Sequence, residues 1–196
     1  MKYKQYFCPQ ITQIAADGSP FRFINLFCVN PRNLRDKTTQ NQTNMALPNI
    51  FQKDVSDQVI ERINQLKSNT QPNWGKMSVA QMLAHCNVTY EMVFEDKHPR
   101  PNFFMKFILK SFIKKVVVSE TPYKHNSGTA PAFLIKETKD FEAEKTRLIG
   151  HISKTQELGE VKFDNKESPS FGILNTTEWN NMFYKHLDHH LTQFGV

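Results

Sequence analysis

The sequence predicts an all-α protein built on a four-helix bundle. Four segments repeat apolar residues at helical spacing, two of them begin with a capping box, and prolines interrupt the longest connection. That connection, residues 96–136, lies between the second and third expected helices. Four helices with one long crossover form a bundle, and the crossover leaves room for an extra short helix.

The first two helices are expected in residues 55–67 and 78–94. The first carries one apolar stripe, formed by Val55, Val59, Ile63 and Leu66. The second begins where Ser78 and Gln81 form a capping box, in which each side chain satisfies a backbone donor that the first turn leaves free.

The last two helices are expected in residues 138–155 and from Asn175 to a stop near Gly195. Asn175 and Glu178 form a second capping box. Between these helices, residues 159–175 contain Gly159, Pro169 and Gly172, and we interpret them as a loop.

The composition changes at Met45, which divides the chain into two predicted parts. Residues 1–44 show no sustained periodicity and are expected to be a disordered or irregular N-terminal extension, whereas residues 45–196 form the bundle domain. We consider two origins for the extension. One is a wrongly assigned start codon upstream of Met45, and the other is a genuine flexible tail.

The charge pattern argues against a nucleic-acid partner. The chain has a formal net charge of +6, but residues 1–44 hold six basic and two acidic groups, so the domain is nearly neutral. No stretch is long and apolar enough for stable membrane insertion. Three cysteines in no ligand-like spacing indicate free thiols. We therefore expect a soluble, cytoplasmic protein.

Histidines near the C-terminus suggest a metal site. His186 and His190 are four residues apart, so a helix places both on one face. His85 lies beside the apolar stripe of the second helix and can supply a third nitrogen ligand. Two ordinary explanations stay open: a favourable interaction of the pair with the helix dipole, and a buried core position for His85. Leu187 stands where a zinc protease motif needs Glu, which excludes that class.

Several segments resemble one known family. They are Trp74-Gly-Lys-Met-Ser-Val-Ala-Gln-Met-Leu-Ala-His85-Cys, Phe171-Gly-Ile-Leu, Glu178-Trp179 and Tyr184-Lys-His186-Leu-Asp-His-His190-Leu-Thr-Gln-Phe-Gly195. Together they are similar to the DUF1569 family of the DinB/YfiT-like superfamily over residues 45–196. The resemblance implies a DinB-like bundle that binds a divalent metal, zinc or nickel, through His85, His186 and His190. One departure is Ser168, which stands where relatives tend to have His.

The resemblance implies two kinds of function. The first is a metal-dependent enzyme, a thiol transferase that uses a low-molecular-weight thiol or a hydrolase, acting on a small-molecule substrate. The second is a non-catalytic bundle that holds a metal or small ligand. Glu91, Asp188 and His189 are candidates to orient the metal ligands, although a solvated surface position is the simpler interpretation of both carboxylates. A homodimer stays open, and so does a purely structural bundle.

The segment Phe103–Val116 combines Lys106, Lys110 and Lys114 at helical spacing with many apolar residues. We expect an extra helix that packs across the bundle or forms a dimer contact, with its lysines in water. A membrane-surface role and a lid over the metal site are the alternatives.

Overall fold

The computed structural model of the 196-residue chain describes residues 47–95 and 97–196. The predicted N-terminal extension, residues 1–44, lies outside the described residues. In the described part of the chain, no helix combines the length and hydropathy that crossing a membrane requires.

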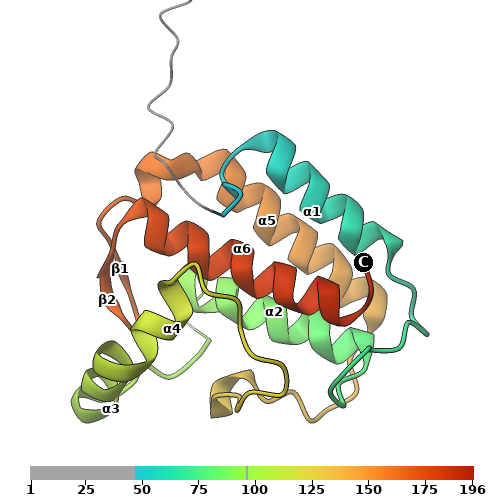
Figure 1. The fold of residues 1–196 in the computed structure, drawn as a ribbon, viewed down its shortest axis with the longest axis horizontal. Coiled ribbons are helices and arrows are strands. Elements are labelled where there is room, and N and C mark those ends of the chain that lie inside the picture. The colour runs from blue at the N-terminus through green and yellow to red at the C-terminus, as the bar shows by residue number, and fades with distance from the viewer. Residues whose placement is uncertain (1–46, 96) are drawn as a thin grey trace, which may run out of the picture. The chain divides into compact units, whose positions relative to one another are not determined.

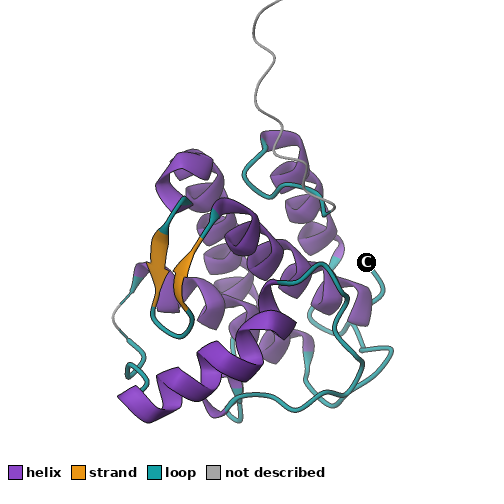
Figure 2. Cartoon of the chain, turned by 60° about the vertical axis from the view of Figure 1, so that its left-hand side comes forward, coloured by secondary structure: helices purple, strands orange, loops and turns teal. Residues whose placement is uncertain are grey.

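The described chain is mostly helical, with one small antiparallel sheet (Figures 1 and 2). The elements in order are α1 (Lys53–Gln65), α2 (Val79–Phe94), α3 (Phe103–Ile108), a π-helical turn (Leu109–Ile113), α4 (Lys114–Val118), a 3₁₀ turn (Pro131–Phe133), α5 (Phe141–Phe163), β1 (Lys166–Ser168), β2 (Gly172–Leu174) and α6 (Thr176–Gln193). The prediction of an all-α chain was therefore wrong in one detail, the two-stranded sheet.

Local capping signals set most helix starts. Both predicted capping boxes are present, at Ser78 with Gln81 and at Asn175 with Glu178. The third predicted helix begins later and ends later than expected. Asp140 caps its first turn, and α5 continues through a kink at Gly159, whose φ of 68° is accessible to a residue without Cβ.

Among the four long helices, α5 and α6 contact each other, and each of them also contacts both α1 and α2 (Figure 1). Aromatic rings fill the space between them. The Phe183 ring lies parallel to Tyr90 on α2 with centroids 4.9 Å apart, and it meets Phe163 of α5 edge-on at 5.5 Å. Trp179 and Phe183 are fully buried, so α6 presents one continuous apolar face to its neighbours.

Residues 159–175, which we interpreted as a loop, instead contain the end of α5 and a short hairpin. Lys166 pairs with Leu174 and Ser168 pairs with Gly172 across its two strands. Ser168 is buried, and its hydroxyl accepts a hydrogen bond of 3.4 Å from the Phe171 backbone. Strands of three residues are too short to show an alternating pattern, which explains why the sequence did not reveal them.

The crossover contains the expected extra helix, formed by α3, the π turn and α4 over residues 103–118. Its lysines do not all point into water, contrary to our expectation. Lys106 pairs with Glu167 of the hairpin at 2.8 Å, and Lys114 pairs with Glu178 of α6 at 2.8 Å. Two of the three lysines in the stripe therefore pair with the body of the protein, and Lys110 is exposed.

Candidate metal centre

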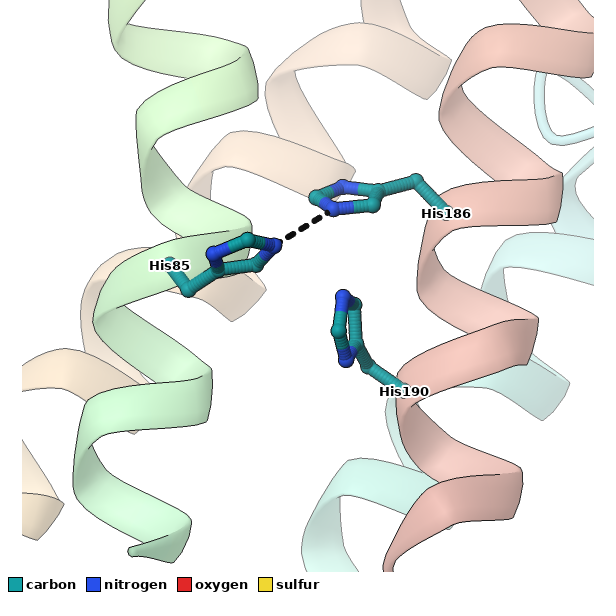
Figure 3. Close-up of side chains that lie close together, drawn as sticks. All are labelled: His85, His186 and His190. Atoms are coloured by element: carbon teal, nitrogen blue, oxygen red, sulfur yellow. Dashed lines mark hydrogen bonds between the residues drawn. The ribbon is translucent and has the colours of Figure 1, made fainter. Parts of the chain in front are cut away.

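Three histidines from two helices converge at one point (Figure 3). His85 comes from α2, and His186 and His190 come from successive turns of α6. One nitrogen from each ring lies within 4.8 Å of the others. The Nε2 atoms of His85 and His186 are 2.9 Å apart, close to the roughly 3.3 Å expected between two tetrahedral zinc ligands at about 2.05 Å.

Hydrogen bonds fix the tautomers of two of these rings. His85 Nδ1 lies 2.9 Å from the Phe133 carbonyl oxygen, which can only accept, so this nitrogen carries the proton. His190 Nδ1 lies 2.8 Å from Gln193 Oε1. The amide of Gln193 is oriented by its own donation to the Trp74 carbonyl, so its oxygen also accepts. Both rings therefore present an unprotonated Nε2 to the cluster.

His186 is the ring that can change tautomer. Its Nδ1 lies 3.0 Å from the Thr89 hydroxyl, which can donate or accept. Without a cation, His186 Nε2–H donates to His85 Nε2 while Thr89 donates to Nδ1. If a cation were bound, His186 would carry its proton on Nδ1, and the Thr89 hydroxyl would accept a hydrogen bond from it. The cluster thus needs only one proton to change place before it offers three lone pairs.

Burial keeps these rings neutral. It lowers the pKa of His190 to about 3, with a further contribution from the charge of His85. The pKa of His186 lies well below its usual range, first because of burial and then because of neighbouring histidines. Burial also lowers the pKa of His85, against the opposing effect of its bond to Phe133. Neutral imidazole is the form that binds metals.

Three ligands, and no fourth, come together within residues 47–95 and 97–196. Among the described residues, no carboxylate or thiol joins the three histidines. Cys86 follows His85 in sequence, but its thiol is buried against Met82 Sδ at 3.8 Å, and burial raises its pKa. Part of the His186 side chain stays accessible to solvent, while its two ring nitrogens bond to His85 and Thr89. Three protein ligands with an open position are typical of catalytic zinc sites.

Comparison with known proteins gives one match. The model of a family of proteins of unknown function, DUF1569, matches residues 45–195. The chain belongs to the DUF1569 family. No curated protein and no solved structure matches it.

Other predicted site residues of this DUF1569 protein lie away from the three rings. Glu91 bonds to His98 at 2.7 Å and to Arg147, and Asp188 pairs with Arg62 at 2.8 Å. Neither carboxylate hydrogen-bonds to His85, His186 or His190.

His189 contacts the cluster only by its ring edge. Its centroid lies 5.0 Å from that of His190, and it also faces Trp74, Tyr123 and His125. Together with Lys185 and neighbouring side chains, these residues line a small cavity of about 150 Å³ next to the metal centre.

The residues that hold the ligand rings were missed by sequence reasoning. Gln193 follows His190 by three residues on α6, a spacing that could have suggested it. Thr89 approaches His186 from α2, and the Phe133 carbonyl comes from the crossover. Neither approach has a local sequence signal, because each depends on how distant segments pack.

Proposed function

We propose that this DUF1569 protein binds one divalent ion, zinc or nickel, through Nε2 of His85, His186 and His190. The observation that carries the proposal is the hydrogen bonding of Nδ1 on all three rings, which directs all three Nε2 atoms to one point. We further propose that α1, α2, α5 and α6 form a DinB-like four-helix bundle around this site.

The proposed activity is that of a metal-dependent transferase that uses a low-molecular-weight thiol, or of a hydrolase, acting on a small molecule in the cytoplasm. An ion at this site would lower the pKa of a bound thiol or water, which supplies a nucleophile at neutral pH. The protein's part is to hold the three nitrogens neutral and fixed.

Phe133 supports a small, partly apolar substrate. Its ring lies edge-on to His85 with centroids 5.3 Å apart and to His186 at 6.0 Å. The 3₁₀ turn that carries it therefore forms an apolar wall beside the cluster. Such a wall excludes water from one side of the reacting atoms and strengthens electrostatic interactions there.

Cobalt-substituted protein tests the proposal. We expect Co²⁺ to bind wild type, and a small thiol added afterwards to produce a sulfur-to-cobalt charge-transfer absorbance. His186→Ala should show neither change, while His151→Ala, which alters a half-buried histidine elsewhere, should retain both. Thiol-dependent turnover of electrophilic substrates, abolished by a chelator and restored by zinc or nickel, would then identify the transferase.

The same experiment separates the alternatives. Cobalt binding without a thiol band, combined with water-dependent turnover of ester or amide substrates, favours the hydrolase. Cobalt binding without any turnover favours a non-catalytic metal-binding bundle. Absence of cobalt binding would contradict the proposed metal site itself.

A further inference from the structure

The helix over residues 103–118 turns an apolar, aromatic face outward. Phe103 is 90% exposed, Phe104 70% and Phe112 68%, and Phe107 and Val116 are also more than half exposed. Figure 2 shows this helix on the outside of the molecule, below the hairpin. Soluble proteins rarely leave so many large apolar side chains together in water, so the face indicates an interaction surface.

The structure holds this face outward by specific polar contacts. Lys106 and Lys114 form ion pairs with Glu167 and Glu178 on the body of the protein. The π turn between them has more residues per turn, which keeps both lysines on the inner side where a regular helix would rotate the second one away.

Two residues of α6 fix the other end of the helix. Asn181 donates to the Val118 carbonyl at 2.9 Å, and the Lys185 ammonium donates to the carbonyls of Val116 and Ser119. These contacts satisfy free carbonyls at the C-terminal end of α4. The outward orientation of the apolar face therefore results from a built attachment at both ends.

The helix carries basic groups beside the face, and carboxylates balance part of this charge: Lys97 pairs with Glu95, Lys106 with Glu167 and Lys114 with Glu178. Residues 97–119 contain six lysines and arginines and not one acidic residue. Lys106 and Lys114 face the protein, whereas Lys110 and Lys115 are exposed on the same helix. An apolar face with exposed lysines beside it complements a surface that is apolar inside and negatively charged outside.

We propose that this helix docks the protein on the surface of an anionic lipid bilayer, with its phenylalanines in the interface and Lys110 and Lys115 among the headgroups. The charge pattern disfavours other occupants. A second copy of this chain would bring like charges together across a symmetric contact. Residues 1–46 carry six basic and two acidic groups, so they do not complement the face either.

The end of the helix further favours a lipid surface over a protein groove. Phe103, Phe104 and Met105 are consecutive, so their side chains point in directions about 100° apart, and all three are exposed. A rigid groove covers one side of a helix, whereas a fluid interface can surround its tip. The apolar surface continues into a hollow of about 450 Å³ beside the hairpin, where Ile173 is 65% exposed.

Vesicle sedimentation of the full, untagged chain tests the proposal. We expect wild type to sediment with vesicles of phosphatidylcholine and phosphatidylserine and far less with phosphatidylcholine alone. Phe104→Gln combined with Phe112→Gln should weaken binding by roughly 100-fold, about tenfold for each phenylalanine. Val161→Gln, a matched change at a side chain that is 91% exposed on α5, should leave binding unchanged. Lys110→Glu with Lys115→Glu should abolish it.

Three results would overturn the proposal. One is wild type that stays in solution with anionic vesicles. Another is a double phenylalanine variant that sediments as well as wild type. The last is a wild-type dimer, seen by gel filtration, that the phenylalanine variant converts to a monomer while neither protein binds vesicles, because the face would then be a contact between copies.

Discussion

Two histidine-containing clusters lie along α2, and their histidines have different kinds of hydrogen-bond partners. The first is the three-histidine cluster of His85, His186 and His190. The second, which we call the carboxylate network, contains Glu91, Glu95, His98, Arg147 and His151. In the network, His98 lies 2.7 Å from Glu91, and His151 lies 3.3 Å from Glu95.

The clusters differ in where the positive charge comes from. The network supplies its own cations: Arg147 pairs with Glu91 and with Glu144 at 2.8 Å, and Lys97 pairs with Glu95 at 2.5 Å. The three-histidine cluster has neutral hydrogen-bond partners on one side and converging lone pairs on the other. In this protein the three candidate ligand rings bond to neutral groups, whereas the two histidines of the network bond to carboxylates that also have cations nearby.

Removal of a ligand should produce the largest difference between the clusters. Zinc at about 1,000 times its dissociation constant adds about 4 kcal/mol to the free energy of unfolding. We expect His186→Ala to lose this zinc-dependent increment, measured by urea unfolding with and without zinc. His151→Ala should keep the increment. If it lost as much of the increment as His186→Ala, the proposal that only the three-histidine cluster binds metal would be contradicted.

Removal of the network's arginine should be the next largest effect. Arg147→Met leaves the buried carboxylates of Glu91 and Glu144 without their shared cation, which should cost about 3 kcal/mol of stability. Urea unfolding of the metal-free variant measures the cost. The zinc-dependent increment should be the same as in wild type, and a smaller increment would mean that the two clusters are coupled.

Acid should affect the histidines and the carboxylates of these clusters in different pH ranges. The His190 ring has a folded pKa of about 3, whereas an unfolded histidine titrates near about 6.5, so between these values the unfolded chain binds more protons. The stability of the metal-free protein should therefore fall as the pH drops below about 6.5, by about 2 kcal/mol at pH 5 from His190 alone.

The carboxylates of the network should respond only at lower pH, whereas His151, whose pKa burial also lowers, adds to the loss that begins below about 6.5. Burial acts to raise the pKa of Glu91, but the hydrogen bonds from His98 and Arg147 and the nearby positive charges outweigh it and lower the pKa. The stability from Glu91 is then present above its unfolded pKa and is lost as the pH falls further. Unfolding curves that stay flat between pH 7 and 5 in wild type, measured with a chelator, would contradict the burial of neutral histidines.

A change outside the ligand set should have the smallest effect. Thr89→Val removes the hydroxyl that supports both tautomers of His186, and loss of such a support weakens metal affinity by roughly tenfold. Competition with a chromogenic chelator measures the affinity. Thr155→Val is the matched control, because the Thr155 hydroxyl bonds only within α5, to the His151 carbonyl. An unchanged affinity in Thr89→Val would show that the hydroxyl has no part in the site.

The sequence predicted features that depend on local pattern. The capping boxes at Ser78 and Asn175 begin α2 and α6, and the four-residue spacing of His186 and His190 places both rings on one face. One feature that depends on distant packing, the approach of His85 to His186 and His190, was also predicted. The hydrogen bonds that orient these rings were not. The Phe133 carbonyl bonds to His85, which is 48 residues away in the sequence. No sequence pattern near either residue predicts this hydrogen bond.

The helix over residues 103–118 shows a different failure. Its lysine stripe suggested a solvated face by the usual rule for amphipathic helices. The rule failed because Glu167 and Glu178, far along the chain, draw Lys106 and Lys114 inward. Which face of a helix is buried depends on the segments that pack against it, and the sequence of the helix alone does not identify those segments.

Bound metal in untagged protein is the most direct test of the three-histidine centre. Elemental mass spectrometry should find about one divalent ion per chain in wild type and in His189→Ala, whose ring neighbours the cluster without being one of its three ligands. His85→Ala, His186→Ala and His190→Ala should each remain folded and lose the ion. Wild type that stays metal-free after incubation with zinc, nickel and iron would contradict the account.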